Sequence, residues 1–140
     1  MKKNIILFLF ILFIQHCGFA PIYNENKQTN FFIKLVETDG DRVINEILNS
    51  EIRRISNNQS NKKIKLKINT SFEKNILSKN IKGSTSDFRI ILSANFLVEQ
   101  NGITENINFQ EKHNVKNLSD IFEQKNYEET LKRNFALSTI

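Results

Sequence analysis

The chain has 140 residues, with 20 Lys and Arg against 15 Asp and Glu, and a formal net charge of +5. This length suffices for one small domain with a single core and argues against a multidomain protein. The charge is too mild to indicate a polyanionic partner, because the Asn, Lys and Ile bias is that of an AT-rich genome, and we expect no nucleic acid among the partners.

The first 16 residues are typical of a bacterial signal peptide and end at the only cysteine, Cys17. Two lysines precede an apolar run over residues 5–14, which is too short to span a bilayer and fits the core of a secretory signal. In a lipoprotein this thiol carries diacylglycerol and the freed amine is acylated, and two or more chains hold a protein stably on a membrane. The alternative is an uncleaved N-terminal anchor with an incidental cysteine, because His16 is not the small residue that usually precedes the acylated position.

With Cys17 lipidated, no thiol remains for a disulfide or a cysteine metal site, and we expect no cofactor besides the covalent lipid. Gly18 stands where an Asp tends to retain lipoproteins in the inner membrane. We therefore expect a lipid-anchored protein on the periplasmic side of the outer membrane. Residues 17–30 form a predicted lipidated tether, and residues 31–140 a single domain.

The domain is predicted to begin with a strand over 31–37, which is rich in β-branched and aromatic residues. Asp39-Gly40-Asp41 breaks this strand and offers an N-cap to a helix over 41–57. Apolar residues at steps of three and four give that helix one buried side: Val43, Ile44, Ile47, Leu48, Ile52 and Ile55.

Strict alternation of lysine and aliphatic residues over 63–68 predicts a strand with one solvated and one buried face. The solvated side carries Lys63, Lys65 and Lys67. Such a row can meet the phosphates and carboxylates of a lipopolysaccharide core, and we assign Arg89 of the neighbouring strand to the same face. The alternatives are a solvated face without a ligand, or an edge strand that lysines protect from aggregation.

Asn101-Gly102 is the strongest turn signal in the chain, because both central positions of a type I′ turn need positive φ. A two-residue loop there predicts an antiparallel hairpin of strands 86–100 and 103–115. Its register places Phe96 opposite Ile107 and Ala94 opposite Phe109, so that apolar residues face one another.

A second helix is predicted from an N-cap at Asn126, with Tyr127, Leu131 and Phe135 on its buried side. No stop signal precedes Ile140, which also fits a helix that is cut short there. The order of strand, helix, three strands and helix predicts an α+β domain, with a mostly antiparallel four-stranded sheet and two helices packed on one face.

The segment Cys17-Gly18-Phe19-Ala20-Pro21-Ile22-Tyr23 resembles the C-G-F-x-P-L-Y start of the lipopolysaccharide-assembly lipoprotein family LptE, in its alphaproteobacterial form. Ile22 stands where the family usually has Leu. The length and the order of elements also match, so the resemblance covers most of the mature chain.

The resemblance implies a non-enzymatic lipoprotein that plugs the lumen of an LptD-type β-barrel and helps lipopolysaccharide pass into the outer leaflet. We expect the apolar, proline-stiffened residues Phe19, Pro21, Ile22 and Tyr23 to dock against the barrel wall. The simpler alternative is that they touch the membrane surface beside the lipid anchor.

The sequence contains no catalytic set. His113 is the only histidine after the predicted lipid site, and no nucleophile motif, nucleotide-binding loop or metal-spaced cluster is present. We therefore expect neither an enzyme nor a metal site. A second hypothesis for function is a stand-alone lipoprotein that faces the periplasm and binds a small or acidic ligand.

Overall fold

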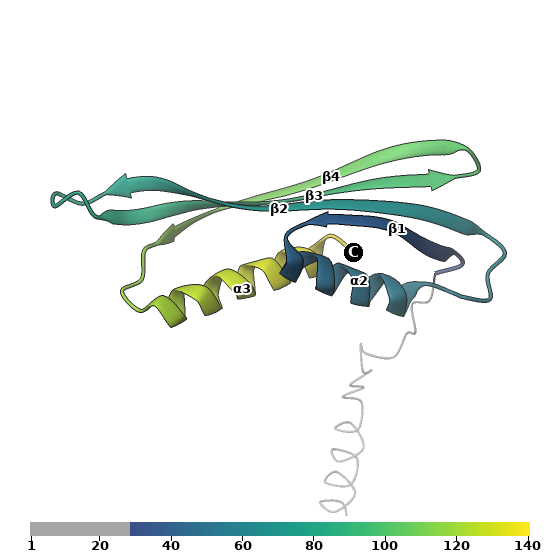
Figure 1. Ribbon diagram of the computed structural model, residues 1–140, viewed down its shortest axis with the longest axis horizontal. Coiled ribbons are helices and arrows are strands. Elements are labelled where there is room, and N and C mark those ends of the chain that lie inside the picture. Colours follow the sequence, from purple (N-terminus) through teal and green to yellow (C-terminus); the bar gives the residue numbers. More distant parts are fainter. Residues whose placement is uncertain (1–28) are drawn as a thin grey trace, which may run out of the picture.

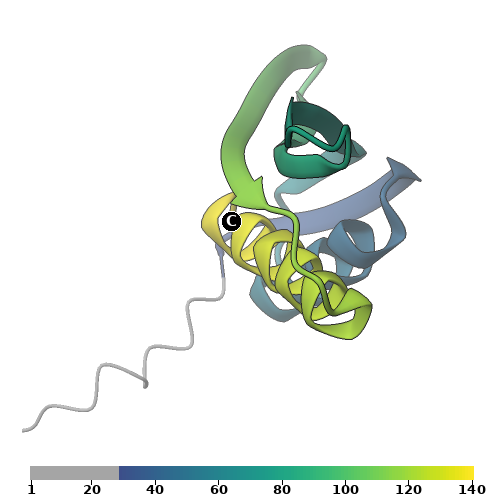
Figure 2. The same ribbon diagram turned by 90° about the vertical axis from the view of Figure 1, so that its left-hand side faces the viewer.

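The computed structural model describes residues 29–140, so the predicted signal peptide, Cys17 and most of the tether lie outside the described residues. The elements are β1 (Phe32–Gly40), α2 (Arg42–Ile55), β2 (Lys63–Lys79), β3 (Thr85–Gln100), β4 (Ile103–Lys116) and α3 (Ile121–Ser138). The strands form one sheet in the order β1-β2-β3-β4, and both helices lie on one face of it (Figures 1 and 2). The predicted α+β fold is confirmed, with β1 parallel to β2 and the other neighbours antiparallel.

Helix α2 begins where β1 ends, at Asp41. The carboxylate of Asp41 accepts a hydrogen bond from the backbone N–H of Ile44 at 3.1 Å, which confirms the predicted N-cap. The predicted end of the first strand was wrong: β1 continues through Asp39 to Gly40. It does so because these two residues pair with Asn69 and Thr70 of the parallel strand β2.

The core lies between the sheet and the helices, and the alternation predicted for β2 and β3 sets which side chains enter it. Its buried members are Ile44, Leu48, Ile52, Leu66, Ile68, Ile90, Leu92, Ala94, Phe96, Val115, Phe135 and Ala136. Burying one large apolar side chain stabilises a fold by roughly 1.5–3 kcal/mol. The contact between sheet and helices is therefore the main source of stability.

The hairpin of β3 and β4 has the predicted register. Asn101 and Gly102 form its turn with φ of 52° and 81°. Phe96 lies opposite Ile107, and its ring meets that of Phe109 edge-on, with centroids 5.7 Å apart.

The start of α3 differs from the prediction. The helix begins at Ile121 rather than near Asn126, because Asp120 caps it and accepts hydrogen bonds from the N–H groups of Phe122 and Glu123 at 2.7 and 3.2 Å. Periodicity misses this turn because its two apolar residues are exposed to solvent.

The buried side of α3 also differs in part. Phe135 is fully buried and Leu131 packs against the core, as predicted, but Tyr127 is 44% exposed. Gln124 takes an inner position instead. Its side-chain oxygen accepts a hydrogen bond from the N–H of Leu118, which explains how a polar residue is tolerated there.

Candidate functional site

The candidate site is the face of the sheet that the helices leave bare, which we call the open face. It is formed by the alternate residues of each strand that point away from the core, among them the three lysines of β2. Because β2 lies between β1 and β3, it is not an edge strand. Protection of an edge against aggregation therefore does not explain the lysine row.

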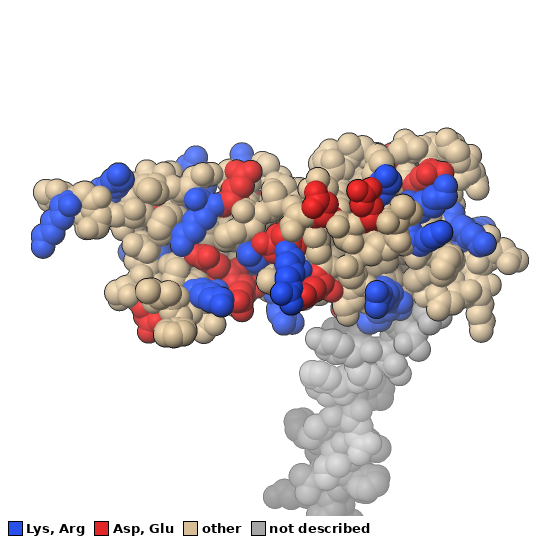
Figure 3. Space-filling view, viewed as in Figure 1, with Lys and Arg blue, Asp and Glu red and all other residues tan. Residues whose placement is uncertain are grey.

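Two lysines of the row are ion-paired across strands. Lys65 lies 2.8 Å from Glu99, and Lys67 lies 3.0 Å from Glu37. These pairs are solvent-exposed, and such pairs contribute roughly 0–1 kcal/mol, so a ligand can replace them at little cost. Lys63 has no ion-pair partner among the described residues. Acidic and basic side chains are likewise interspersed over the side of the molecule seen in Figure 3.

The structure does not bring Arg89 to the lysine row. Arg89 is on the open face, but it pairs with Asn75 of β2, eight residues along that strand from Lys67. At 3.3 Å per residue this is about 26 Å. Its guanidinium instead donates a hydrogen bond to the side chain of Asn114 on β4, at 3.3 Å.

A row of asparagines crosses the open face beside the lysines. Asn69, Asn95 and Asn108 are direct neighbours across β2, β3 and β4. Sequence reasoning missed this row because asparagine is so common in the chain that no single one stands out. The turn at 101–102 was the available signal, since its register already places Asn95 opposite Asn108.

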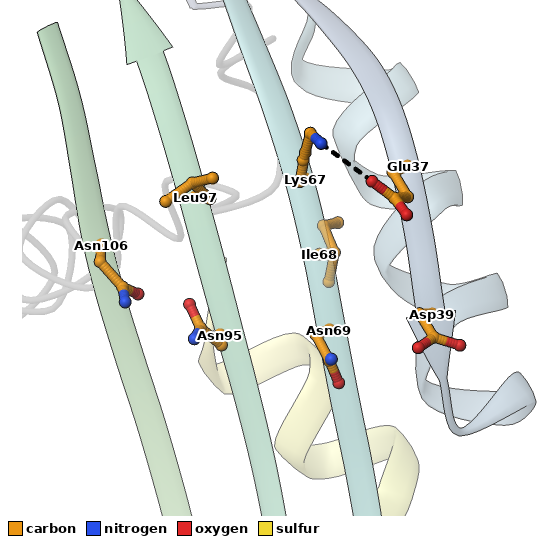
Figure 4. A pocket seen from close by; sticks show the side chains of 8 residues that line it. All are labelled: Glu37, Asp39, Lys67, Ile68, Asn69, Asn95, Leu97 and Asn106. Carbon is orange, nitrogen blue, oxygen red and sulfur yellow. Dashed lines mark ion pairs between the residues drawn. The ribbon is translucent and has the colours of Figure 1, made fainter.

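A shallow depression of about 260 Å³ lies where the lysine and asparagine rows meet (Figure 4). It is lined by Glu37, Asp39, Lys67, Ile68, Asn69, Asn95, Leu97 and Asn106. In Figure 4 the ammonium of Lys67 points to Glu37 rather than into open space. With two carboxylates and one paired ammonium, the depression suits a neutral hydrogen-bonding group better than an anion.

His113 contacts a carboxylate but belongs to no larger cluster. Its ring lies 3.1 Å from Glu111, on the helix side of β4. Over residues 29–140 no three His, Cys, Asp or Glu side chains gather in a way that suits a metal ion. In the same range no helix combines the length and apolarity that crossing a membrane requires.

No family model and no curated protein matches the sequence. Among solved structures, the fold is similar to that of the rare lipoprotein B from Shewanella oneidensis, with a TM-score of 0.54 and 14% identity over 74% of this chain and 87% of that one. A minor lipoprotein from Acinetobacter baumannii gives a TM-score of 0.51 and 14% identity, over 76% and 88% of the two chains. Identity this low shows a shared fold alone, and the fold is one that lipoproteins have.

Proposed function

We propose that this protein is a non-enzymatic, lipid-anchored outer-membrane protein of the LptE type, which plugs an LptD-type β-barrel and assists lipopolysaccharide assembly. One combination supports the proposal: the Cys17–Tyr23 segment stands at a predicted acylation site, and a domain with the fold of two solved lipoproteins follows it. A lipoprotein signal alone, or this fold alone, would fit many envelope proteins. The two features together favour the LptE family.

The polarity of the open face supports the proposal that the domain lies inside a β-barrel. Transmembrane β-barrels have polar interiors, so a domain inside one must offer polar surface to the wall. The asparagine row and the exchangeable ion pairs of Lys65 and Lys67 provide hydrogen-bond donors and acceptors over three adjacent strands. A bilayer core would not accept such a face, because its polar groups would lose their water.

We assign the contact with lipopolysaccharide to Lys63, Lys65 and Lys67 alone. Lys63 has its charge available, whereas Lys65 and Lys67 must exchange Glu99 and Glu37 for phosphates. Phosphates carry more charge than a carboxylate, so this exchange is favourable where both partners are exposed. Arg89 is too distant to reach the same phosphate cluster.

The second hypothesis, a small or acidic ligand bound without a barrel, draws little support from the open face. Its depression is shallow and carries two carboxylates against one ammonium, which repels an acidic molecule. A neutral polar ligand remains compatible with the amides of Asn69 and Asn95. No barrel is required in that case, which separates the two hypotheses in one experiment.

Co-purification tests the proposal. Full-length protein with a C-terminal tag is isolated from detergent-solubilised outer membranes and from inner membranes of the same cells. We expect a stoichiometric complex with one large β-barrel protein in the outer-membrane fraction only. Recovery of the tagged protein alone from the outer membrane, under detergent conditions that preserve other envelope complexes, would exclude the plug and favour the stand-alone lipoprotein.

A further inference from the structure

The end of the domain where the tether enters, which we call the tether end, is strongly basic. The N–H of Thr29 donates a hydrogen bond to the carbonyl of Ile55 at 2.8 Å, and the N–H of Phe32 donates to that of Lys62 at 2.8 Å. Residues 29–36 and 52–66, which form this end, contain no Asp or Glu. Their basic residues are Lys34, Arg53, Arg54, Lys62, Lys63 and Lys65. Basic side chains are seen gathered at this end, on the right of Figure 3.

Most of this charge has no counter-charge. Of the six basic residues, only Arg54 and Lys65 have an ion-pair partner among the described residues. Lys34, Arg53 and Lys62 are exposed, and none of them belongs to the lysine row of the open face. Lys34 lies on the open face, because its neighbours in β1 pack against the core, and Arg53 lies in the last turn of α2, on the other side of the sheet. The positive charge therefore surrounds the point where the tether enters.

The tether holds this end close to the membrane. Only the residues between Cys17 and Thr29 separate the predicted anchor from the domain, and fully extended they span about 40 Å. A domain inside a barrel would keep this end at the periplasmic rim, because the anchor lies in the lipid outside the barrel. The strand β2 has 17 residues and is about 55 Å long, whereas the apolar band of a transmembrane barrel is about 25 Å tall. The domain is therefore long enough for its tether end to project from the lumen.

We propose that the tether end binds the anionic phospholipid headgroups of the leaflet that holds the anchor, through Lys34, Arg53 and Lys62. Each Lys or Arg near an anionic bilayer surface strengthens binding about fivefold, and a basic patch adds to the hold of a lipid anchor. The contact orients the domain, so that the hairpin of β2 and β3 points away from this leaflet (Figure 1). The inference rests on the membrane anchor of the proposed function but requires no barrel.

Energy transfer from a single tryptophan to a dansyl-labelled headgroup lipid tests this contact, because the chain has no tryptophan of its own. Asn61→Trp places the donor at the tether end, and Ile81→Trp places it in the exposed turn between β2 and β3, at the other end of the sheet. Full-length protein purified from membranes is reconstituted into phosphatidylcholine vesicles with and without phosphatidylglycerol. We expect phosphatidylglycerol to increase the transfer from Asn61→Trp but not from Ile81→Trp, and added salt to reverse the increase.

Removal of charge tests the three residues. In the Asn61→Trp background, replacing Lys34, Arg53 and Lys62 together by Gln should lower the ratio of docked to undocked domain about a hundredfold and so abolish the increase. The matched control replaces Lys79, Lys82 and Lys125 by Gln, has the same net charge and should keep the increase, with circular dichroism to confirm the fold of both variants. No increase in Asn61→Trp, an equal increase at both donors, or an equal loss in both triple variants would overturn the proposal. Because the vesicles contain no barrel, none of these results bears on the co-purification test.

Discussion

Lys132 of α3 places its ammonium 2.5 Å from the carboxylate of Asp41, the residue that caps α2. Both side chains are about 15% exposed, and the ammonium also lies 4.2 Å from the centre of the Phe72 ring on β2. The backbone N–H of Asp41 donates to the hydroxyl of Thr70 at 3.0 Å. The carboxylate of Asp41 therefore connects the two helices where β1 ends. The backbone N–H of the same residue connects this junction to the sheet.

Removing Lys132 should destabilise the domain far more than removing an exposed ion pair. Lys132→Met leaves Asp41 largely buried without its counter-charge, and breaking such a pair costs about 2–4 kcal/mol after allowance for partial exposure. Glu46→Gln is the control, because its pair with Arg42 is solvent-exposed and such a pair contributes little to stability. Urea unfolding measures both. Equal losses in the free energy of unfolding for Lys132→Met and Glu46→Gln would show that the buried pair stabilises the domain no more than the exposed one.

Gly40 should tolerate no side chain. Its φ is +100°, and a Cβ there would lie 1.7 Å from the carbonyl oxygen of Thr70, so Gly40→Ala must displace β1 from β2. We expect a loss of about 3 kcal/mol or more in the free energy of unfolding. Gly83→Ala controls for φ alone, because Gly83 has φ +80° and open space around it, and should cost about 1–2 kcal/mol. A similar loss for both variants would contradict the close approach at Gly40.

How far the sequence predicts this fold depends on whether local signals decide each feature. The register of β3 and β4 was predictable, because Asn101-Gly102 fixes the turn and the alternation fixes the faces. The start of α3 was not, because Ile121 and Phe122 are exposed and hide the helical period. The parallel pairing of β1 with β2 agrees with the helix α2 that connects them, since parallel neighbours need such a crossover, but no residue pattern fixes that these two strands are neighbours in the sheet.

The candidate site was predictable only in part, for a similar reason. Alternation placed Lys63, Lys65 and Lys67 together on the open face, since it is a property of one strand. Their acidic partners, and the distance of Arg89 from them, depend on the registers of neighbouring strands. Those registers include shifts that no local pattern reveals.

Asp87 should make the end of the β2–β3 hairpin acid-sensitive. Hydrogen bonds from the hydroxyls of Ser78 and Ser86 hold the pKa of the Asp87 carboxyl below its ordinary value. Because the folded pKa is the lower one, this stabilisation is fully present above the ordinary pKa of about 4 and is lost as the pH falls through the folded pKa. Carboxyl NMR titration should show a higher pKa for Asp87 in Ser78→Ala than in wild type. An unchanged pKa of Asp87 in Ser78→Ala would show that the hydrogen bond from Ser78 does not lower it.

Cys17 should carry the lipid. Mass spectrometry of the protein from membranes should find an N-terminus at Cys17 with added acyl chains, because acylation follows cleavage before this residue. Cys17→Ser should remain uncleaved and lose the acyl mass. An intact Met1 in the wild-type protein would leave Cys17 an ordinary thiol and favour an uncleaved N-terminal anchor.

The lysine row should determine affinity for lipopolysaccharide. Replacing Lys63, Lys65 and Lys67 together by Ser removes three charges from the open face, and at about 0.5–1 kcal/mol each the affinity should fall roughly tenfold or more. The matched control replaces three lysines elsewhere by Ser, Lys79, Lys82 and Lys125, and so has the same net charge. Binding of purified lipopolysaccharide is measured for both variants, with circular dichroism to confirm the fold. Equal affinities of the two variants would mean that net charge, and not the lysine row, attracts lipopolysaccharide. An affinity of the Lys63, Lys65 and Lys67 variant equal to that of the wild type would exclude the row as the binding site.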